Sequence, residues 1–186
     1  MGEAAQPRPL SLEAYLEWEA QSPERHELVE GVPYAMAGAS KAHNLLVQNL
    51  AFLLRAPARA KGCRLYTETV KLKVSQSTLY YPDLMVVCGP FSPHPLYEEA
   101  PCLVAEVVSP GTERLDRGEK RLAYLGLPSL KAYLLVSASE PRVEVYRKSG
   151  KGVAHEIYTE GQVLLPCVDA PLDLYALYED VELERA

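Results

Sequence analysis

Two single carboxylates stand in otherwise apolar segments and could bind a metal ion. Asp83 lies in Tyr-Tyr-Pro-Asp-Leu-Met-Val-Val-Cys, and Glu106 lies in Cys-Leu-Val-Ala-Glu-Val-Val-Ser-Pro. A buried carboxylate without a partner is costly, so each must be neutralised or paired. Arg, Lys or backbone N–H groups would satisfy either acid alone. For both together the pattern favours a shared divalent cation, and two oxygen ligands with open water positions suit Mg²⁺ or Mn²⁺.

The two acids belong to segments that are predicted to be neighbouring strands. Residues 79–88 and 102–109 are nearly continuous apolar runs, as in central strands covered on both faces. On the second run, Glu106 shares a face with residues 104 and 108. A basic side chain at position 108 would reach the same pocket, but this residue is Val108. The strand itself therefore provides no Lys.

The segment after this strand provides a candidate cation. A helix is predicted from about residue 117 to 125, and a crossover helix packs back onto its own sheet, so Lys120 could reach Glu106. A solvent-exposed Lys on a charged helix is an equally good reading. Asp116 and Glu119 have the spacing of a capping box, which favours Asp116 as a helix N-cap over a metal ligand.

The remaining pattern predicts helices first and then a mixed sheet with one crossover helix. The order indicates an α/β (α+β) layered domain. It is predicted to be a single domain over 1–186, with a core from about 10 to 178. Pro57 is expected to end or kink the second helix. The other expected elements are a helix over 12–20 capped by Ser11, a hairpin of 26–30 and 33–37, a helix from Ser40 to about 60, strands over 64–74 and 131–137, and a hairpin of 142–147 and 154–159.

Charge is distributed unevenly along the 186 residues. The net charge is −6, but residues 1–34 and 169–186 each carry −5, which leaves +4 on residues 35–168. A mildly basic body is compatible with a phosphate-bearing substrate without requiring one. No apolar run is long enough to span a bilayer, and the first residues lack a secretory pattern. We therefore expect a cytoplasmic protein with no membrane partner.

The four cysteines do not have the spacing of a zinc site. Cys63, Cys88, Cys102 and Cys167 are far apart in the sequence, and three of them lie in apolar, strand-like segments. The expectation is that they are buried, unpaired side chains in a reducing compartment.

The ordered set of motifs resembles a known family. Pro82-Asp83 followed by Glu106-Val107-Val108 resembles the PD-(D/E)xK nuclease signature without its Lys. The whole chain resembles the Uma-two family of restriction-endonuclease-like proteins between about residues 26 and 147. The stretches that carry the resemblance are Glu27-Leu28-Val29-Glu30-Gly31, His43, Pro82-Asp83, Glu106-Val107-Val108-Ser109-Pro110, Asp116 with Lys120, and Tyr124.

The resemblance implies a restriction-endonuclease-like fold, a mixed central sheet flanked by helices. It implies that Asp83, Glu106 and the backbone carbonyl of Val107 hold the metal, and that Lys120 replaces the Lys absent at position 108. Glu27 matches an acid of the family and completes the site, unless it is a surface strand residue. A His at a helix start, such as His43, is more often a cap or packing residue than a catalyst.

The function that follows is Mg²⁺- or Mn²⁺-dependent hydrolysis of nucleic acid, with DNA as the expected substrate. Homo-oligomers are expected if both strands are cut, because this needs two sites. Two alternatives remain open. One is a nuclease-fold protein that binds nucleic acid without cleaving it, and the other is an oligomerisation domain whose acidic ends contact basic bodies of other subunits.

Overall fold

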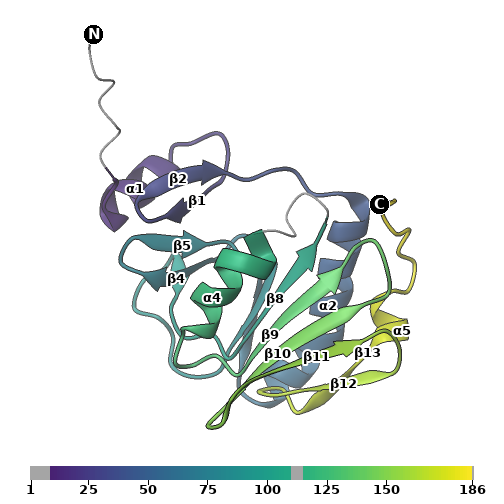
Figure 1. Ribbon diagram of the computed structural model, residues 1–186. Coiled ribbons are helices and arrows are strands. Elements are labelled where there is room, and N and C mark those ends of the chain that lie inside the picture. The colour runs from purple at the N-terminus through teal and green to yellow at the C-terminus, as the bar shows by residue number, and fades with distance from the viewer. Residues whose placement is uncertain (1–8, 110–114, 186) are drawn as a thin grey trace.

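The computed structural model describes residues 9–109 and 115–185 (Figure 1). The helices are α1 (Leu12–Glu19), α2 (Lys41–Ala60), the π-helical turn η1 (Asp116–Lys120), α4 (Arg121–Leu125) and α5 (Leu174–Leu177). The strands are β1 (His26–Val29), β2 (Val32–Ala35), β3 (Arg64–Thr67), β4 (Lys71–Ser75), β5 (Thr78–Tyr80), β6 (Leu84–Val87), β7 (Tyr97–Glu98), β8 (Leu103–Val108), β9 (Ala132–Ser137), β10 (Val143–Ser149), β11 (Gly152–Tyr158), β12 (Gln162–Leu165) and β13 (Ala170–Asp173).

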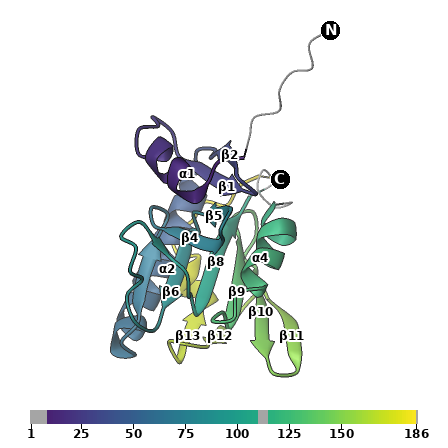
Figure 2. The same ribbon diagram turned by 90° about the vertical axis from the view of Figure 1, so that its left-hand side faces the viewer.

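A six-stranded mixed sheet forms the centre of the molecule, in the order β11-β10-β9-β8-β6-β3. β8 and β9 are parallel, and the segment that contains η1 and α4 connects them, while the other neighbours are antiparallel. Helix α2 packs on one face and α4 on the other, as Figures 1 and 2 show from two directions. The mixed α+β sheet flanked by helices is confirmed.

A second sheet, in the order β2-β1-β5-β4-β7, lies at one end of the first and packs against α1. One long hairpin contributes to both sheets. β3 pairs with β6 in the central sheet, whereas β4 pairs with β5 in the second sheet. The expected unbroken strands 64–74 and 79–88 are therefore wrong, since each is interrupted in its middle.

The two interruptions lie side by side and bind each other. The backbone N–H of Glu68 donates to the carbonyls of Pro82 and Asp83, at 3.1 and 3.2 Å. Glu68 has a backbone φ of 46°, in the left-handed region that residues other than Gly rarely adopt. Such backbone conformations persist where the surrounding structure fixes them, and they concentrate at functional sites. The chain thus crosses between the two sheets twice at one point, and Asp83 lies there.

The first two helices begin where the sequence predicts. The Ser11 hydroxyl accepts from Ala14 N–H at the start of α1, and the Ser40 hydroxyl accepts from His43 N–H at the start of α2. Pro57 does not end α2, which continues to Ala60. A Pro this near the end of a helix removes a single backbone hydrogen bond, and the buried apolar face of the helix extends past it.

The crossover helix differs from its prediction at its first residues. Asp116 is not the N-cap, because the residue before it, Leu115, is already helical, and the described turn from Asp116 to Lys120 is π-helical. The wider turn places Asp116 and Lys120 on the buried side, with Asp116 Oδ1 3.6 Å from Lys120 Nζ. π-helical turns inside helices occur frequently at functional sites. Pro110, part of the family resemblance, lies outside the described residues.

The expectation of unpaired cysteines is wrong. Disulfides join Cys63 to Cys88 and Cys102 to Cys167. The partners are 25 and 65 residues apart, so only the folded chain brings them together. The C-terminal hairpin of β12 and β13, followed by α5, was not predicted either. It packs against α2 and joins the apolar core between α2 and the central sheet. Among the described residues, no helix is both long enough and apolar enough to cross a membrane.

Candidate active site

A cavity of about 530 Å³ opens where the two sheets meet. Its wall combines the hairpin bend, the start of α2, the segment after β2 and the start of the crossover helix. All of the side chains that the sequence singled out, Glu27, Asp83, Glu106 and Lys120, line this cavity together with His43 and Asp116.

Asp83 and Glu106 are held together through the backbone. Asp83 immediately precedes β6, and Glu106 lies in the neighbouring strand β8. The backbone N–H of Val107 donates to Asp83 Oδ2 at 2.6 Å, and the backbone N–H of Asp83 donates to Glu106 Oε2 at 3.2 Å. Asp83 is therefore oriented by the backbone next to Glu106, and Glu106 by the backbone of Asp83.

Glu106 is almost fully buried, with 2% of its surface exposed. Its Oε1 accepts from the hydroxyl of Tyr124 at 2.8 Å and from Lys120 Nζ at 3.3 Å. Burial raises the pKa of Glu106 well above its ordinary value, and the Lys120 charge opposes this rise. The nearby carboxylates, first of all Asp83, raise the pKa further. The protein thus maintains a carboxyl group that a further cation would stabilise in its charged form.

Lys120 reaches the site from the helix and lies among three carboxylates. Its Nζ is 3.0 Å from Glu27 Oε1, 3.3 Å from Glu106 Oε1 and 3.6 Å from Asp116 Oδ1. Burial lowers the pKa of Lys120, but the charges of these three acids outweigh burial, so the pKa lies above its ordinary value. The amine therefore stays protonated. The alternative of an exposed surface Lys is wrong for this side chain.

Glu27 comes to the site from the second sheet. Its side chain is buried, and besides Lys120 it accepts a hydrogen bond from the backbone N–H of Tyr81 at 3.1 Å. The alternative of a surface strand residue is thus wrong. Because β1 belongs to one sheet and β8 to the other, Lys120 joins the two sheets by binding an acid from each.

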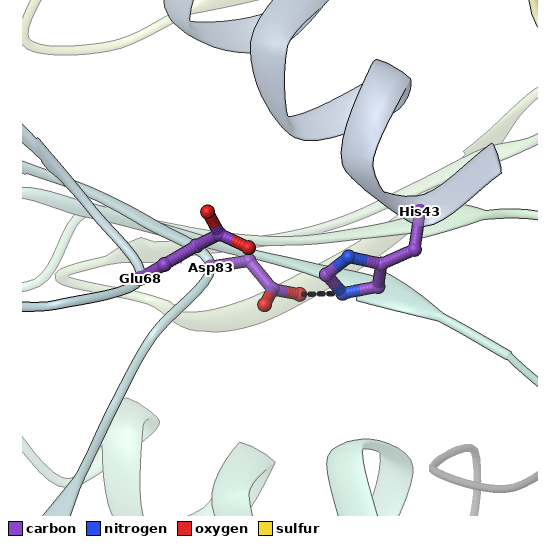
Figure 3. A group of neighbouring side chains, drawn as sticks. All are labelled: His43, Glu68 and Asp83. Atoms are coloured by element: carbon purple, nitrogen blue, oxygen red, sulfur yellow. Dashed lines mark hydrogen bonds and ion pairs between the residues drawn. The ribbon is translucent and has the colours of Figure 1, made fainter. Parts of the chain in front are cut away.

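His43 and Glu68 form a second group around Asp83 (Figure 3). His43 Nε2 lies 3.1 Å from Asp83 Oδ2, and the ligand atoms of His43, Glu68 and Asp83 all lie within 4.8 Å of one another. Burial lowers the pKa of His43, but the hydrogen bond and charge of Asp83 outweigh it, and the pKa is raised overall.

Sequence reasoning treated His43 as a cap or packing residue and overlooked Glu68. The cap at this helix is Ser40, and the imidazole of His43 points to Asp83. Glu68 stands in the polar stretch Thr67-Glu68-Thr69, where neither an apolar neighbourhood nor a motif distinguishes it. Its position depends on the bend of the long hairpin, which the strand pattern did not reveal.

The part of the cavity lining that the structure describes has an excess of negative charge. It includes two basic side chains, Arg25 and Lys120, besides His43. Its acids are Glu27, Glu68, Asp83, Glu106, Asp116 and Glu184. Oxygen donors with one imidazole fit a divalent cation, which would offset the excess charge. Val107 lines the cavity as well, and its carbonyl as a metal ligand stays a prediction.

Comparison with known proteins identifies the family of the chain. Residues 12–177 match the Uma2 family, described as "Putative restriction endonuclease". Two uncharacterized proteins of Synechocystis are similar: slr1290 at 37% identity over 77% of this chain and 76% of that protein, and sll1609 at 32% over 76% and 82%.

A crystal structure from Anabaena variabilis, described as "a putative nuclease belonging to DUF820", has the same fold. Its TM-score is 0.75 and its identity 18%, covering 91% of this chain and 98% of that one. The restriction-endonuclease-like fold is thereby confirmed. The match to the family over residues 12–177 shows family membership. This chain belongs to the Uma2 family.

Proposed function

We propose that the protein is a metal-dependent phosphodiester hydrolase that cleaves nucleic acid, with DNA as the expected substrate. The observation that carries the proposal is the buried pairing of Glu106 with Lys120 directly beside Asp83. Asp83 and Glu106 offer two carboxylates for a metal, and Lys120 offers one fixed cation. The three side chains come from separate segments of a nuclease-like fold. The cavity is open to solvent, so a phosphate of a long chain can enter it.

Asp83 and Glu106, with the backbone carbonyl of Val107, would hold the ion, Mg²⁺ or Mn²⁺. A bound divalent cation supplies a water of lowered pKa and offsets charge on the phosphate. The Val107 N–H keeps Asp83 in place by its 2.6 Å hydrogen bond, and Tyr124 does the same for Glu106. The two carboxylates are therefore oriented before the ion arrives.

Lys120 would place its protonated amine beside the reacting phosphate. Glu27 and Asp116 hold the amine and compensate the cost of burying it. A fixed positive charge in a site with little water stabilises charge that develops on phosphate oxygens in the transition state. Glu27 thus acts as a positioning residue for Lys120. Homo-oligomers would allow two such sites to cut both strands.

A cleavage assay tests the proposal directly. Single-stranded DNA, double-stranded DNA and RNA are incubated with the wild-type protein in Mg²⁺, in Mn²⁺ and in EDTA. We expect metal-dependent cleavage that is abolished in Asp83→Asn and Glu106→Gln, and both variants should retain the wild-type circular-dichroism spectrum. Glu156→Gln, whose carboxylate binds Arg147 on the distant strand pair β10 and β11, is the matched control and should cleave normally.

Two results would contradict the proposal. Full activity in both site variants would remove Asp83 and Glu106 from the reaction. Salt-dependent binding of nucleic acid without cleavage in either metal would instead favour the binding protein that kept the fold and lost catalysis.

A further inference from the structure

The acids around Asp83 differ in how far they are already engaged. Both oxygens of Glu106 have partners, since Oε1 binds Lys120 and Tyr124 and Oε2 accepts from the Asp83 N–H. The Glu68 carboxylate stands across from Asp83 and His43, and it lines the cavity. The group best placed to surround an ion is therefore not the pair Asp83 and Glu106 alone.

We propose that a first-row transition-metal ion binds between His43 Nε2, the Glu68 carboxylate and the Asp83 carboxylate, and that the imidazole makes the site prefer Mn²⁺ to Mg²⁺. This deepens the proposed function, on which its catalytic meaning rests, but ion binding itself does not depend on cleavage. Asp83 belongs to both ligand groups.

The spacing fits an ion of this class. Metal–nitrogen and metal–oxygen bonds are about 2.1 Å, so adjacent ligand atoms on one ion lie about 3 Å apart. His43 Nε2 and Asp83 Oδ2 are 3.1 Å apart. Glu68 lies within the 4.8 Å that encloses the group, and rotation of its flexible side chain closes the remaining gap.

The backbones of both additional ligands are fixed. His43 lies in the first turn of α2, where Ser40 caps its N–H. Glu68 is held on both sides, because its N–H donates to Pro82 and Asp83 and its carbonyl accepts from Arg25 Nη1 at 2.9 Å. Ligands on fixed backbones lose little freedom when an ion binds, which favours affinity.

The imidazole decides which ions are preferred. Mg²⁺ takes oxygen ligands and gives up its waters reluctantly, whereas imidazole suits transition metals. The second nitrogen of His43, Nδ1, is buried and has no hydrogen-bond partner among the described residues. Within the described residues, Asp83 is therefore the only hydrogen-bond partner of the His43 imidazole, and its Nε2 is the ring nitrogen directed at the proposed ion.

Calorimetry on the metal-stripped full chain tests the proposal. Mn²⁺ and Mg²⁺ are titrated in turn into the wild type, His43→Gln and Glu68→Gln. We expect the wild type to bind Mn²⁺ about ten-fold or more tightly than Mg²⁺. His43→Gln should weaken Mn²⁺ binding about 10- to 100-fold, with a much smaller change for Mg²⁺. Glu68→Gln, on another element, should weaken both ions.

His26→Gln is the matched control. Its imidazole also binds a carboxylate, with Nδ1 3.2 Å from Glu19 Oε2, but it lies outside the cavity lining. It should bind Mn²⁺ as the wild type does. A second readout is the electron spin echo of bound Mn²⁺, in which modulation from a directly bound imidazole nitrogen should be present in the wild type and His26→Gln and absent in His43→Gln.

Unchanged Mn²⁺ affinity and nitrogen modulation in His43→Gln would overturn the inference. The proposed function fails separately. His43-dependent Mn²⁺ binding without cleavage in any metal would support the ion site and reject the hydrolase. Cleavage that needs Asp83 and Glu106, with Mn²⁺ binding indifferent to His43 and Glu68, would support the hydrolase and reject this ion site.

Discussion

Two buried glutamates stand in one row of the central sheet, and their surroundings are opposite. Glu106 on β8 and Glu144 on β10 both lie beside Leu135 of β9, and each is 2% exposed. Glu144 is surrounded by two guanidinium groups and an imidazole: Arg117 at 2.6 Å, Arg142 at 3.1 Å and His155 at 2.8 Å. Among the described residues, Glu106 has one cation within 4 Å, Lys120, which it shares with two other acids.

The pKa values shift in opposite directions for the same reason. Burial raises the pKa of both carboxyl groups. At Glu144 the hydrogen bonds and charges of Arg117 and its other partners outweigh burial, so the pKa is lowered. At Glu106 the Lys120 charge does not outweigh burial, and the other acids add to the rise. Glu144 is thus complete within the protein, whereas Glu106 lies in a cluster that a further cation would stabilise.

The largest expected effect separates two cations on the same helix. Lys120→Gln should lower metal-dependent cleavage by on the order of 100- to 1000-fold, because it removes the charge beside the phosphate. Arg117→Gln removes a cation from the Glu144 cluster and should cleave within about three-fold of wild type per folded molecule. Initial rates at saturating metal and at a temperature where both variants are folded measure this. Equal losses of cleavage rate in Lys120→Gln and Arg117→Gln would show that the two cations do not differ in role.

The second effect concerns stability without metal. Glu144→Gln leaves Arg117, Arg142 and His155 without their acid and should lower the free energy of unfolding by about 2 kcal/mol. The expected loss of unfolding free energy is smaller than that for breaking a fully buried ion pair, because Arg117, Arg142 and His155 are partly exposed. Glu106→Gln removes a carboxyl group that burial disfavours and should leave stability unchanged or raise it by up to about 1 kcal/mol. Urea titration of both variants measures these free energies. A larger loss of stability in Glu106→Gln than in Glu144→Gln would contradict the difference between the two clusters.

Metal addition and removal should act on only one of the two clusters. At a free Mn²⁺ concentration of about 100 times Kd, the folded protein gains about 2.7 kcal/mol, and EDTA reverses the gain. Glu144→Gln should gain as much as the wild type, while Asp83→Asn should gain little. Thermal melts with and without Mn²⁺ provide the test. A gain in Asp83→Asn equal to the wild type's would place the ion elsewhere.

The smallest effect is the pH dependence of the Glu144 cluster. The pKa of Glu144 is lowered in the folded protein from its ordinary value of 4.5. Its contribution to stability is therefore fully present above about pH 4.5 and is lost as the pH falls through the lower folded value, by at most about 1.4 kcal/mol per pH unit. The difference in unfolding free energy between wild type and Glu144→Gln should be constant from pH 7 to about 5 and shrink below it. A difference in unfolding free energy that grows on acidification would contradict a lowered pKa of Glu144.

Much of the site could be predicted, because single acids in apolar strands are conspicuous. Asp83 and Glu106 were found in this way, whereas the packing of a crossover helix left Lys120 open between a site residue and an exposed Lys, and the family resemblance favoured the site. Glu27 came from the family resemblance. Glu68 could not be found, since its place depends on a bend in the middle of a strand pattern that reads as continuous. The cluster around Glu144 was missed because Arg117 reaches it from the crossover helix, a contact that the strand pattern around Arg142, Glu144 and His155 does not reveal.

The elements were predicted best where local chemistry decides them. Ser11 and Ser40 mark helix starts, and the two apolar runs next to Asp83 and Glu106 form the neighbouring strands β6 and β8 as expected. The disulfides and the C-terminal hairpin depend on contacts over long separations, for which single residues carry no local signal.

The row Glu106–Leu135–Glu144 also has a consequence for folding. Neighbouring side chains along a strand point to opposite faces, so a slip of β8 or β10 by one residue would turn its glutamate toward α2. That face of the sheet is packed with apolar side chains such as Leu134, Val143 and Val145. Each mispaired sheet would have an unpaired buried charge. The two acids thereby select the correct strand alignment during folding, whichever of them later serves in chemistry.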